Sequence, residues 1–222
     1  MKHVTQTEAE NLLHDWKYKG YAIVDFLTES EVDEIIAELD RLRINRNQSD
    51  TKWGEYEPYM HPHKESELVN KMLAHPKAIE MMELLFGSEV QGVQTWAYFK
   101  PSGELGRDAH QDGFYSQAGW NKIANISISL DPSDETNGGL WAYEGSHYLP
   151  LLDIEVDEER IKTNPGNWRN ERGKPCVMPE GHDFRKVEGY LRKGQVVLLH
   201  SHCVHGSEAN NSNRMRRNFL GG

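Results

Sequence analysis

Hydrophobic residues recur at two different periods along the chain, and the change between them falls near residue 88. From residue 28 to 43 the apolar positions return every three or four residues, which predicts a helix with one buried face. Thr28 and Glu31 have the spacing of a capping box and are expected to begin this helix. The apolar positions of this helix are Val32, Ile35, Ile36, Leu39 and Leu42.

Two further helices and a short strand are predicted in the same half of the chain. The first helix is expected to begin at a capping Thr7 and to end at Gly20. The second is expected to begin at Pro76 and to end at Gly87. Residues 21–26 are mostly apolar and predict a strand. The face of the first helix that should be buried carries Leu12, Leu13 and Trp16.

After about residue 89 the apolar residues alternate with polar ones, and short segments of this kind are separated by Gly, Pro and Asn. Alternation of this type predicts strands, and many short strands in succession are typical of a sandwich or a jelly roll. We therefore expect one domain over 1–222, with a mainly helical layer over 1–88 and a β core over 89–222. The predicted strands cover 90–100, 122–131, 138–145, 186–194, 195–201 and 214–220.

One long segment, 151–186, has no clear period and is rich in polar residues. A loop of this length inside a compact domain is usually a lid, a binding loop or a disordered insertion. Because strands are predicted on both sides of it, its two ends should lie near the mouth of the β core. We expect it to cover the site and to contribute to the choice of substrate.

Composition and charge narrow the classes of function. The formal net charge of −10 argues against nucleic acid and against an anionic membrane surface as partners. The first ten residues are polar, and no apolar run approaches the length of a membrane span. With only Cys176 and Cys203 there is no disulfide framework. The sequence therefore predicts a cytoplasmic protein, and it makes no prediction of oligomeric state.

The motif HQDGFY at 110–115 is the strongest chemical signal. If the segment is extended, His110 and Asp112 project from one face and Gln111 from the other. An imidazole and a carboxylate side by side can occupy adjacent positions on one metal ion. Two histidines and a carboxylate with open positions are typical of non-haem Fe(II) oxygenases. The motif HSHCVHGS offers three candidates for the second histidine, namely His200, His202 and His205.

Three stretches taken in order resemble the phytanoyl-CoA dioxygenase family of Fe(II)- and 2-oxoglutarate-dependent oxygenases. They are HQDG at 110–113, SLDPSDETNGGLWAYEGSH at 129–147 and HGSEANNSNRMRR at 205–217. The opening strand and helix, at 20–40, look similar to the N-terminus of the family as well. The resemblance implies a mainly β fold with added α-helices around a double-stranded β-helix, which is a cupin-like jelly roll. It also implies Fe(II), 2-oxoglutarate and O2 as cofactors, with succinate and CO2 as co-products.

The resemblance assigns roles to particular residues. In the family the distal histidine directly precedes Gly-Ser, which selects His205 as the third metal ligand. The spacing from this histidine favours Arg216 as the partner of the far carboxylate of 2-oxoglutarate, with Ser207 adding a hydroxyl. Arg214 would share a strand face with Arg216, whereas Arg217 would point the other way and is expected to be a solvated charge.

The walls of a substrate pocket are less well determined. Both a substrate wall and ordinary core packing are compatible with the pattern of the aromatic residues near the motif, which are Trp96, Tyr98, Phe114, Tyr115 and Trp120. Lys100 could face solvent or an anion, and the loop residues Arg169, Arg172 and Lys174 could meet an anionic group or be solvated. We expect Asn137 and Gly138 to form a tight turn and His147 to stabilise another.

The reaction expected from the resemblance is hydroxylation of a C–H bond of a small-molecule substrate. Two alternatives remain open at this stage. A related halogenase is disfavoured because Asp112 occupies the position where halogenases similar to this family carry a small residue. A jelly-roll protein that binds a metal or ligand without turnover would not release succinate.

Overall fold

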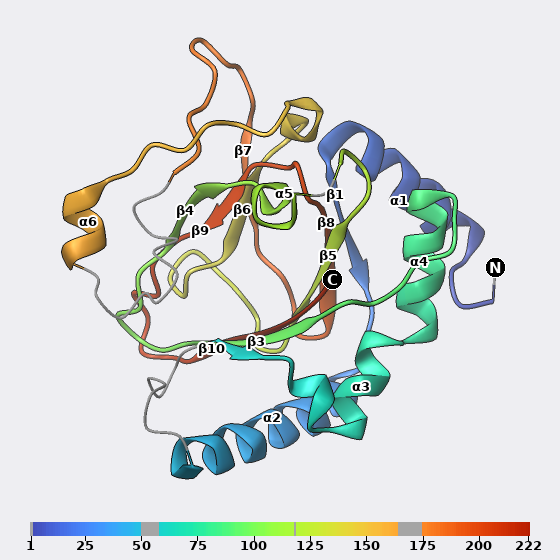
Figure 1. The fold of residues 1–222 in the computed structure, drawn as a ribbon. Helices are drawn as coiled ribbons and strands as arrows, with labels where there is room; N and C mark the ends of the chain where they lie inside the picture. Colours follow the sequence, from blue (N-terminus) through green and yellow to red (C-terminus); the bar gives the residue numbers. More distant parts are fainter. Residues whose placement is uncertain (1, 50–57, 118, 164–174) are drawn as a thin grey trace.

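The computed structural model describes residues 2–49, 58–117, 119–163 and 175–222. Four of its helices, α1 to α4, cover the large sheet of a barrel of two antiparallel sheets, whereas α6 lies on the opposite side of the molecule (Figure 1). The helices are α1 Gln6–Lys19, α2 Glu29–Ser49, α3 Glu67–Leu73, α4 Pro76–Phe86, α5 Asp112–Ser116 and α6 Glu158–Thr163, with 3-10 turns η1 Pro62–Lys64 and η2 Ser146–Tyr148. The strands are β1 Tyr21–Asp25, β2 Tyr59–Met60, β3 Thr95–Lys100, β4 Arg107–His110, β5 Ala124–Ser129, β6 Leu140–Tyr143, β7 Lys186–Gly189, β8 Gln195–His200, β9 His205–Ser207 and β10 Arg216–Gly221.

The two sheets form the predicted jelly roll. The large sheet has the strand order β1-β8-β5-β10-β3-β2, and the small sheet has the order β4-β9-β6-β7. Strands β1 and β2 come from the N-terminal half, which therefore adds to the large sheet as well as to the helical layer. The extent of the single domain over 1–222 stays a prediction.

The helix predicted over 28–43 and the helix that begins at Pro76 are confirmed as α2 and α4. The Thr28 amide donates to the Glu31 carboxylate at 2.8 Å, and the Glu31 amide donates to the Thr28 hydroxyl at 3.3 Å. These reciprocal bonds satisfy amide groups at the helix start. Helix α3 was not predicted, because seven residues are too few for a clear hydrophobic period.

The predicted start of the first helix was wrong by two residues. Thr5, rather than Thr7, caps α1 and forms a capping box with Glu8. The end at Gly20 is confirmed, where the backbone adopts φ of 83° and so favours glycine. Leu12 and Trp16 are buried as expected, but Leu13 is 42% exposed because it lies about 100° around the helix from Leu12.

The predicted strands correspond to observed strands, with two clear errors of length. The segment expected over 186–194 is a strand only over Lys186–Gly189. The segment expected over 90–100 is a strand only from Thr95, and Val93 in its predicted first half is exposed. The Val93 and Gln94 amides donate to the Gly222 carbonyl, which fixes this segment to the end of β10 without strand geometry.

Each face of the large sheet has a different chemical character. The outward face packs on α1, α2, α3 and α4, and it contributes Phe99, Ile128, Val196 and Phe219 to the main hydrophobic core. The inward face carries polar side chains from β5 and β10, which are Asn125, Ser127, Ser129, Arg216 and Asn218. Strand alternation thus separates an apolar, helix-covered layer from a barrel interior that is polar along β5 and β10. The interior is apolar along β8, where Val197 and Leu199 belong to a second hydrophobic cluster.

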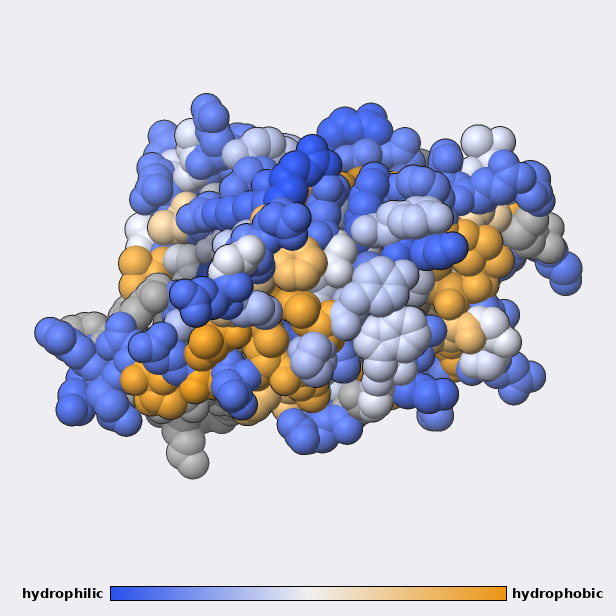
Figure 2. Space-filling view, turned by 90° about the horizontal axis from the view of Figure 1, so that it is seen from above, coloured by the Kyte–Doolittle hydropathy of each residue, from blue (hydrophilic) through white to orange (hydrophobic). Residues whose placement is uncertain are grey.

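The surface agrees with the polar composition of the chain. Figure 2 shows one face on which hydrophilic residues predominate and hydrophobic residues gather in separate patches. Among the described residues, no helix has both the length and the apolar character to cross a bilayer. The expectation of a cytoplasmic location stays a prediction.

Candidate metal centre

His110, Asp112 and His205 converge inside the barrel, as the sequence predicted. One ligand atom of each lies within 4.8 Å of the others, and these three residues are the one group of this kind among the described residues. The His110 Nε2 atom lies 3.6 Å from Asp112 Oδ1, and His205 Nε2 lies 3.5 Å from Asp112 Oδ2. Strands β4 and β9 pair His110 directly with His205, which places both rings on the same face.

The two imidazoles are held in the orientation that a metal requires. His110 Nδ1 contacts the Asp108 carbonyl at 2.8 Å, and His205 Nδ1 contacts the Cys203 carbonyl at 2.9 Å. Because a carbonyl only accepts, each Nδ1 carries the proton and each Nε2 presents its lone pair to the shared point. Burial, chiefly, together with the nearby His205, lowers the pKa of His110, which favours the neutral, ligating form of the ring.

Asp112 reaches the site from a different element than predicted. It is the first residue of helix α5 and not part of strand β4. The predicted geometry still holds locally, because Gln111 between the two ligands is extended, with φ of −118° and ψ of 125°. His110 and Asp112 therefore point the same way, and Gln111 points away from the site and is buried.

Gln111 fastens three segments to one another. Its side-chain amide donates to the carbonyls of Pro150 and His202, at 3.1 and 2.8 Å, and its side-chain oxygen accepts from the Leu152 amide at 2.8 Å. The segment between the two proposed ligands is thereby joined to the turn before His205 and to the start of the long 151–186 segment.

Asn125 on β5 is a site residue that the sequence analysis did not identify. Its side-chain amide donates to Asp112 Oδ2 and so holds the carboxylate in place. The segment ANISIS at 124–129 contained a signal for it, because polar residues alternate with Ile126 and Ile128. When a strand is buried on both faces and one of these faces is polar, the polar face indicates a polar region inside the protein.

His200 and His202 lie outside the metal group, in a buried cluster with His147. The ring centroid of His200 lies 5.3 Å from that of His147 and 5.7 Å from that of His202. His200 Nδ1 accepts from the His202 amide at 3.0 Å, which is a structural role. His147 lies in the turn η2, as expected. Trp120 closes this cluster, donating from its indole to the His147 carbonyl at 2.8 Å.

The buried histidines predict a loss of stability in mild acid. Burial, above all, lowers the pKa of His200 to about 3 and that of His147 to about 4. In the unfolded chain both would titrate near 6.5, so below that pH the unfolded state binds more protons. We expect the free energy of unfolding to fall between pH 6.5 and 5, by about 1 kcal/mol per histidine per pH unit. Denaturant unfolding at several pH values measures this fall in the free energy of unfolding.

One variant separates this effect from general acid sensitivity. His200→Phe should reduce the slope of stability against pH in this window, because the variant lacks a group that the unfolded chain protonates. An unaltered slope in His200→Phe would show that other groups cause the acid sensitivity.

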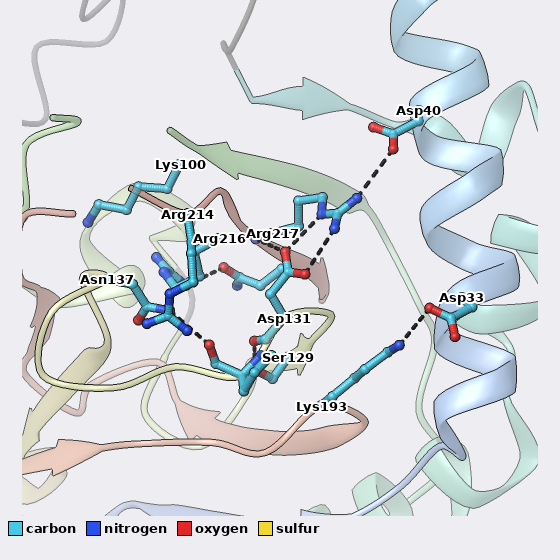
Figure 3. Close-up of polar contacts among 12 residues, drawn as sticks. Asp33, Asp40, Lys100, Ser129, Asp131, Asn137, Lys193, Arg214, Arg216 and Arg217 are labelled. Carbon is cyan, nitrogen blue, oxygen red and sulfur yellow. Dashed lines mark hydrogen bonds and ion pairs between the residues drawn. The ribbon is translucent and has the colours of Figure 1, made fainter. Parts of the chain in front are cut away.

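The three arginines near the C-terminus have different surroundings (Figure 3). Arg214 forms an exposed ion pair with Asp134. Arg217 binds Asp131 with two guanidinium nitrogens, at 2.8 and 2.9 Å, and also contacts Asp40 at 3.3 Å. The expectation of a solvated Arg217 was wrong. The outward face of β10 meets α2, which supplies the Asp40 carboxylate as a partner.

Arg216 has no carboxylate partner among the described residues. Its Nη1 atom donates to Asn218 Oδ1 at 2.8 Å, and its Nε atom is buried without a hydrogen-bond partner. Burial lowers the pKa of Arg216 to about 10, which still leaves the guanidinium charged at neutral pH. A buried cation with an unsatisfied donor is costly unless a ligand completes it.

Ser207 lies close to the same part of the interior. Its hydroxyl oxygen accepts from Lys100 Nζ at 3.1 Å and from the Arg107 amide at 3.2 Å, so its own proton remains available for donation. Lys100 is buried and also donates to the Glu208 carbonyl, which shows that it does not face solvent. Gly206 permits the close strand approach here, because a Cβ atom would meet the Arg107 carbonyl at 2.6 Å.

The aromatic candidates divide into two groups. Trp96 and Tyr98 stack with their ring centroids 6.1 Å apart. They lie on the inward face of β3, because their strand partners are Leu220 and Asn218. Phe114 and Tyr115 follow Asp112 and line a small pocket with His110. Trp120 instead contacts Tyr148 and His200 of the histidine cluster.

The two ends of the 151–186 segment lie beside the metal strand. Ile154 and Cys176 form a bridge, and the Cys176 amide donates to the Ala109 carbonyl at 2.8 Å. Leu152, Ile154 and Cys176 line the same small pocket as His110. Arg169, Arg172 and Lys174 lie outside the described residues. The role of the segment as a cover stays a prediction.

Comparisons with known proteins agree with this geometry. The family model "Phytanoyl-CoA dioxygenase (PhyH)" matches residues 16–218. A probable alpha-ketoglutarate-dependent hypophosphite dioxygenase of Stutzerimonas stutzeri is 25% identical, over 91% of this chain and 73% of its own. A 2-aminoethylphosphonate dioxygenase from the uncultured bacterium HF130_AEPn_1 is 29% identical, over 61% of this chain and 48% of its own.

Solved structures share the fold. The non-heme alpha ketoglutarate dependent epimerase SnoN from nogalamycin biosynthesis superposes with a TM-score of 0.76 and 21% identity. The match covers 98% of this chain and 83% of that one. The cupin-like jelly roll expected from the sequence is therefore confirmed.

Proposed function

The chain belongs to the phytanoyl-CoA dioxygenase family, and from this premise we propose that it is a hydroxylase acting on a C–H bond of a small molecule. It is an Fe(II)- and 2-oxoglutarate-dependent oxygenase, with O2 as the third cofactor. When bound, the iron and 2-oxoglutarate supply the oxidation of an unreactive C–H bond, with succinate and CO2 as co-products.

The residues present fit the metal. His110, Asp112 and His205 would hold it through two neutral imidazoles and one carboxylate, the donor set typical of such iron sites. The Asp108 and Cys203 carbonyls fix the imidazoles, and Asn125 fixes the carboxylate. Hydrogen bonds of this kind to ligands normally strengthen metal binding.

The observation that carries the proposal for 2-oxoglutarate is the unsatisfied Nε atom of the buried Arg216. A guanidinium matches a carboxylate in shape and charge, so the far carboxylate of 2-oxoglutarate would complete it. Ser207 would donate its remaining proton to the same carboxylate, and Lys100 adds a positive charge beside it. Arg214 and Arg217 are less suitable, because each already binds an acidic side chain.

Hydroxylation is favoured over halogenation because Asp112 fills the position that a halide would need, and Asn125 holds it there. Four aromatic residues are proposed to contact the substrate, namely Trp96, Tyr98, Phe114 and Tyr115. Trp120, a candidate from the sequence, is less favoured because it contacts His200 of the histidine cluster. Epimerisation is the second candidate, since the fold also carries that reaction in SnoN.

The test is a succinate assay with Fe(II) and 2-oxoglutarate over a panel of small molecules. The panel includes 2-aminoethylphosphonate and hypophosphite, after the names of the two relatives. We expect at least one carbon compound to stimulate succinate release and to gain one oxygen atom from labelled O2, whereas oxidation of hypophosphite alone, which has P–H but no C–H bonds, would contradict C–H hydroxylation. Asp112→Ala serves as the inactive control.

The product distinguishes the alternatives. A product that is isomeric with its substrate would favour epimerisation and contradict hydroxylation. Iron and 2-oxoglutarate binding without stimulated succinate release from any compound would favour a binding protein without turnover.

A further inference from the structure

An apolar cavity lies between the two sheets, on the side of the barrel away from β4. Its walls come from β1 and β8 of the large sheet, from β6 and β7 of the small sheet, and from Leu191 between β7 and β8. The cavity has a volume of about 300 Å³, its opening included. The side chains that line it include Tyr21, Ala142, Leu191 and Val197, which belong to the second hydrophobic cluster.

On the small sheet the inner end of this cavity adjoins a proposed metal ligand. Val187 pairs with Ala142, and Ala142 pairs with His205. Residues directly opposite each other on neighbouring strands share a face of the sheet. The three side chains therefore form one inward row, which begins at the edge of the small sheet and ends at the metal group.

On the large sheet a second inward row leads to the same place. Tyr21 pairs with Leu199, and Leu199 pairs with Asn125. The side-chain amide of Asn125 donates to Asp112, the carboxylate of the metal group. Both walls of the cavity thus continue, strand by strand, from an edge of the barrel to the residues that would surround the iron.

The outer end of the cavity reaches the surface between two edge strands. Strand β1 ends the large sheet and β7 ends the small sheet, so each has a neighbouring strand on one side only. Ile23 on β1 is 40% exposed and Val187 on β7 is half-buried, and both line the cavity. Apolar side chains are therefore present from the opening to the metal group.

The walls offer few polar contacts to a ligand. The Tyr21 hydroxyl already donates to the Glu144 carboxylate at 2.8 Å. Glu188 is the one charged residue of the lining, but it lies opposite Trp141 on the outer face of the small sheet, and its carboxylate contacts Lys186 at 3.4 Å. Cavities with apolar walls of this kind stay dry and take up apolar guests such as xenon.

O2 is the ligand of this family that suits such a cavity. The iron and 2-oxoglutarate need charged and polar partners, which the ligand triad and Arg216 would supply, whereas O2 is small and apolar. The ends of the 151–186 segment lie beside β4, at the opposite edge of the small sheet from β7. A volume of about 300 Å³ that includes the opening is at the lower limit of sites for organic ligands, but a diatomic molecule needs far less.

We propose that this cavity admits O2 to the metal group from the edge between β1 and β7. Ile23 and Val187 line the entrance, and Ala142, beside His205, lines the inner end. The inference rests on the use of O2 by the family and does not depend on the identity of the substrate.

Xenon tests the cavity without iron or turnover. The full chain, labelled with ¹³C in its methyl groups, is placed under increasing xenon pressure and followed by NMR. We expect saturable shifts of the methyl signals of Ala142, Val187 and Val197. Ile128 is the internal control, because it lies in the main core on the outer face of the large sheet and should not shift.

Nitric oxide, a diatomic gas that binds ferrous iron, tests the path. The protein is loaded anaerobically with Fe(II) and 2-oxoglutarate, and nitric oxide association and dissociation are followed by stopped flow. Val187→Phe should narrow the entrance and slow both rates severalfold by the same factor, because an obstacle on a path slows both directions equally and leaves the affinity unchanged. Ile23→Trp should act alike from the opposite sheet, so either variant suffices if the other does not fold. Val93→Phe is the matched control, since Val93 is exposed and lies outside the cavity.

Several outcomes would overturn the inference while normal succinate release preserved the proposed function. They are the absence of xenon shifts in the cavity, and unchanged nitric oxide rates in Val187→Phe and Ile23→Trp. A loss of nitric oxide affinity would also overturn it, by showing damage to the metal group rather than an obstacle. A dimeric wild type that Val187→Phe converts to monomers would make the opening an interface between copies and overturn it too. Failure of nitric oxide to bind the loaded wild type would contradict the proposed metal centre and the inference with it.

Discussion

Replacing His205 with alanine is expected to abolish tight Fe(II) binding, whereas replacing His202 with alanine should leave it intact. The His205 Nε2 atom faces Asp112 at 3.5 Å, but the His202 ring lies outside the group that could hold a metal. Losing a residue that only supports a ligand typically costs ten- to a hundredfold in metal affinity, so losing a ligand should cost more than about a hundredfold.

Iron retained after anaerobic dialysis, measured per chain, gives the answer for each variant. Circular dichroism and thermal unfolding establish that both variants fold, which matters because His202 and His205 are both buried. Loss of iron in His202→Ala, with retention in His205→Ala, would show that the wrong histidine had been assigned.

Replacing Arg216 with alanine is expected to weaken 2-oxoglutarate binding strongly and to leave iron binding nearly unchanged. The variant removes a buried guanidinium and would leave the far carboxylate of 2-oxoglutarate buried and unpaired. Truncating one partner of such a pair costs about 2–5 kcal/mol, which corresponds to a change in dissociation constant of about thirty- to several-thousandfold. The dissociation constant of 2-oxoglutarate is measured anaerobically with Fe(II) bound.

Arg214→Ala and Arg217→Ala are the matched controls. Arg214→Ala removes an exposed ion pair and should have little effect on any property. Arg217→Ala should lower thermal stability, because Asp131 would lose its partner, without a comparable loss of 2-oxoglutarate affinity. Unchanged affinity in Arg216→Ala, together with a large loss in either control, would move the role to that arginine.

Local patterns in the sequence predicted those parts of the fold that local physics determines. Helix α2 follows from its hydrophobic period and from the Thr28–Glu31 capping box, both of which involve residues at most four apart. Strand β5 follows from the alternation of Ile126 and Ile128 with polar residues, and strand β8 follows from an apolar run. The start of α1 was placed at the wrong threonine, because Thr5 and Thr7 each precede a glutamate at the spacing of a capping box, so this pattern does not distinguish them.

The metal group was predictable in part from local geometry. His110 and Asp112 point the same way because the intervening residue is extended, and this needs no knowledge of the remaining chain. The choice of His205 over His200 and His202 came from family resemblance, since all three follow one apolar strand at short spacing. The structure adds a physical reason, which is the direct pairing of β9 with β4.

Contacts that depend on pairing between distant segments were not predictable. Asn125 meets Asp112 only because β5 lies within the large sheet, opposite the start of α5. Arg107 pairs with Ser207 only because of a bulge in β4, which no feature of the short segment 107–110 reveals. Arg217 appeared to be a surface charge because Asp40, which it contacts, lies 177 positions away in the sequence.

The most direct test of the central claim is an anaerobic titration of the protein with Fe(II) and 2-oxoglutarate, followed by the charge-transfer absorption that a chelated 2-oxo acid gives with ferrous iron. We predict saturation at one iron and one 2-oxoglutarate per chain, loss of the absorption in His205→Ala at any 2-oxoglutarate concentration, and recovery of the absorption in Arg216→Ala only at much higher 2-oxoglutarate. Absence of the absorption in the wild type, or its persistence in His205→Ala with unchanged affinities, would contradict the account.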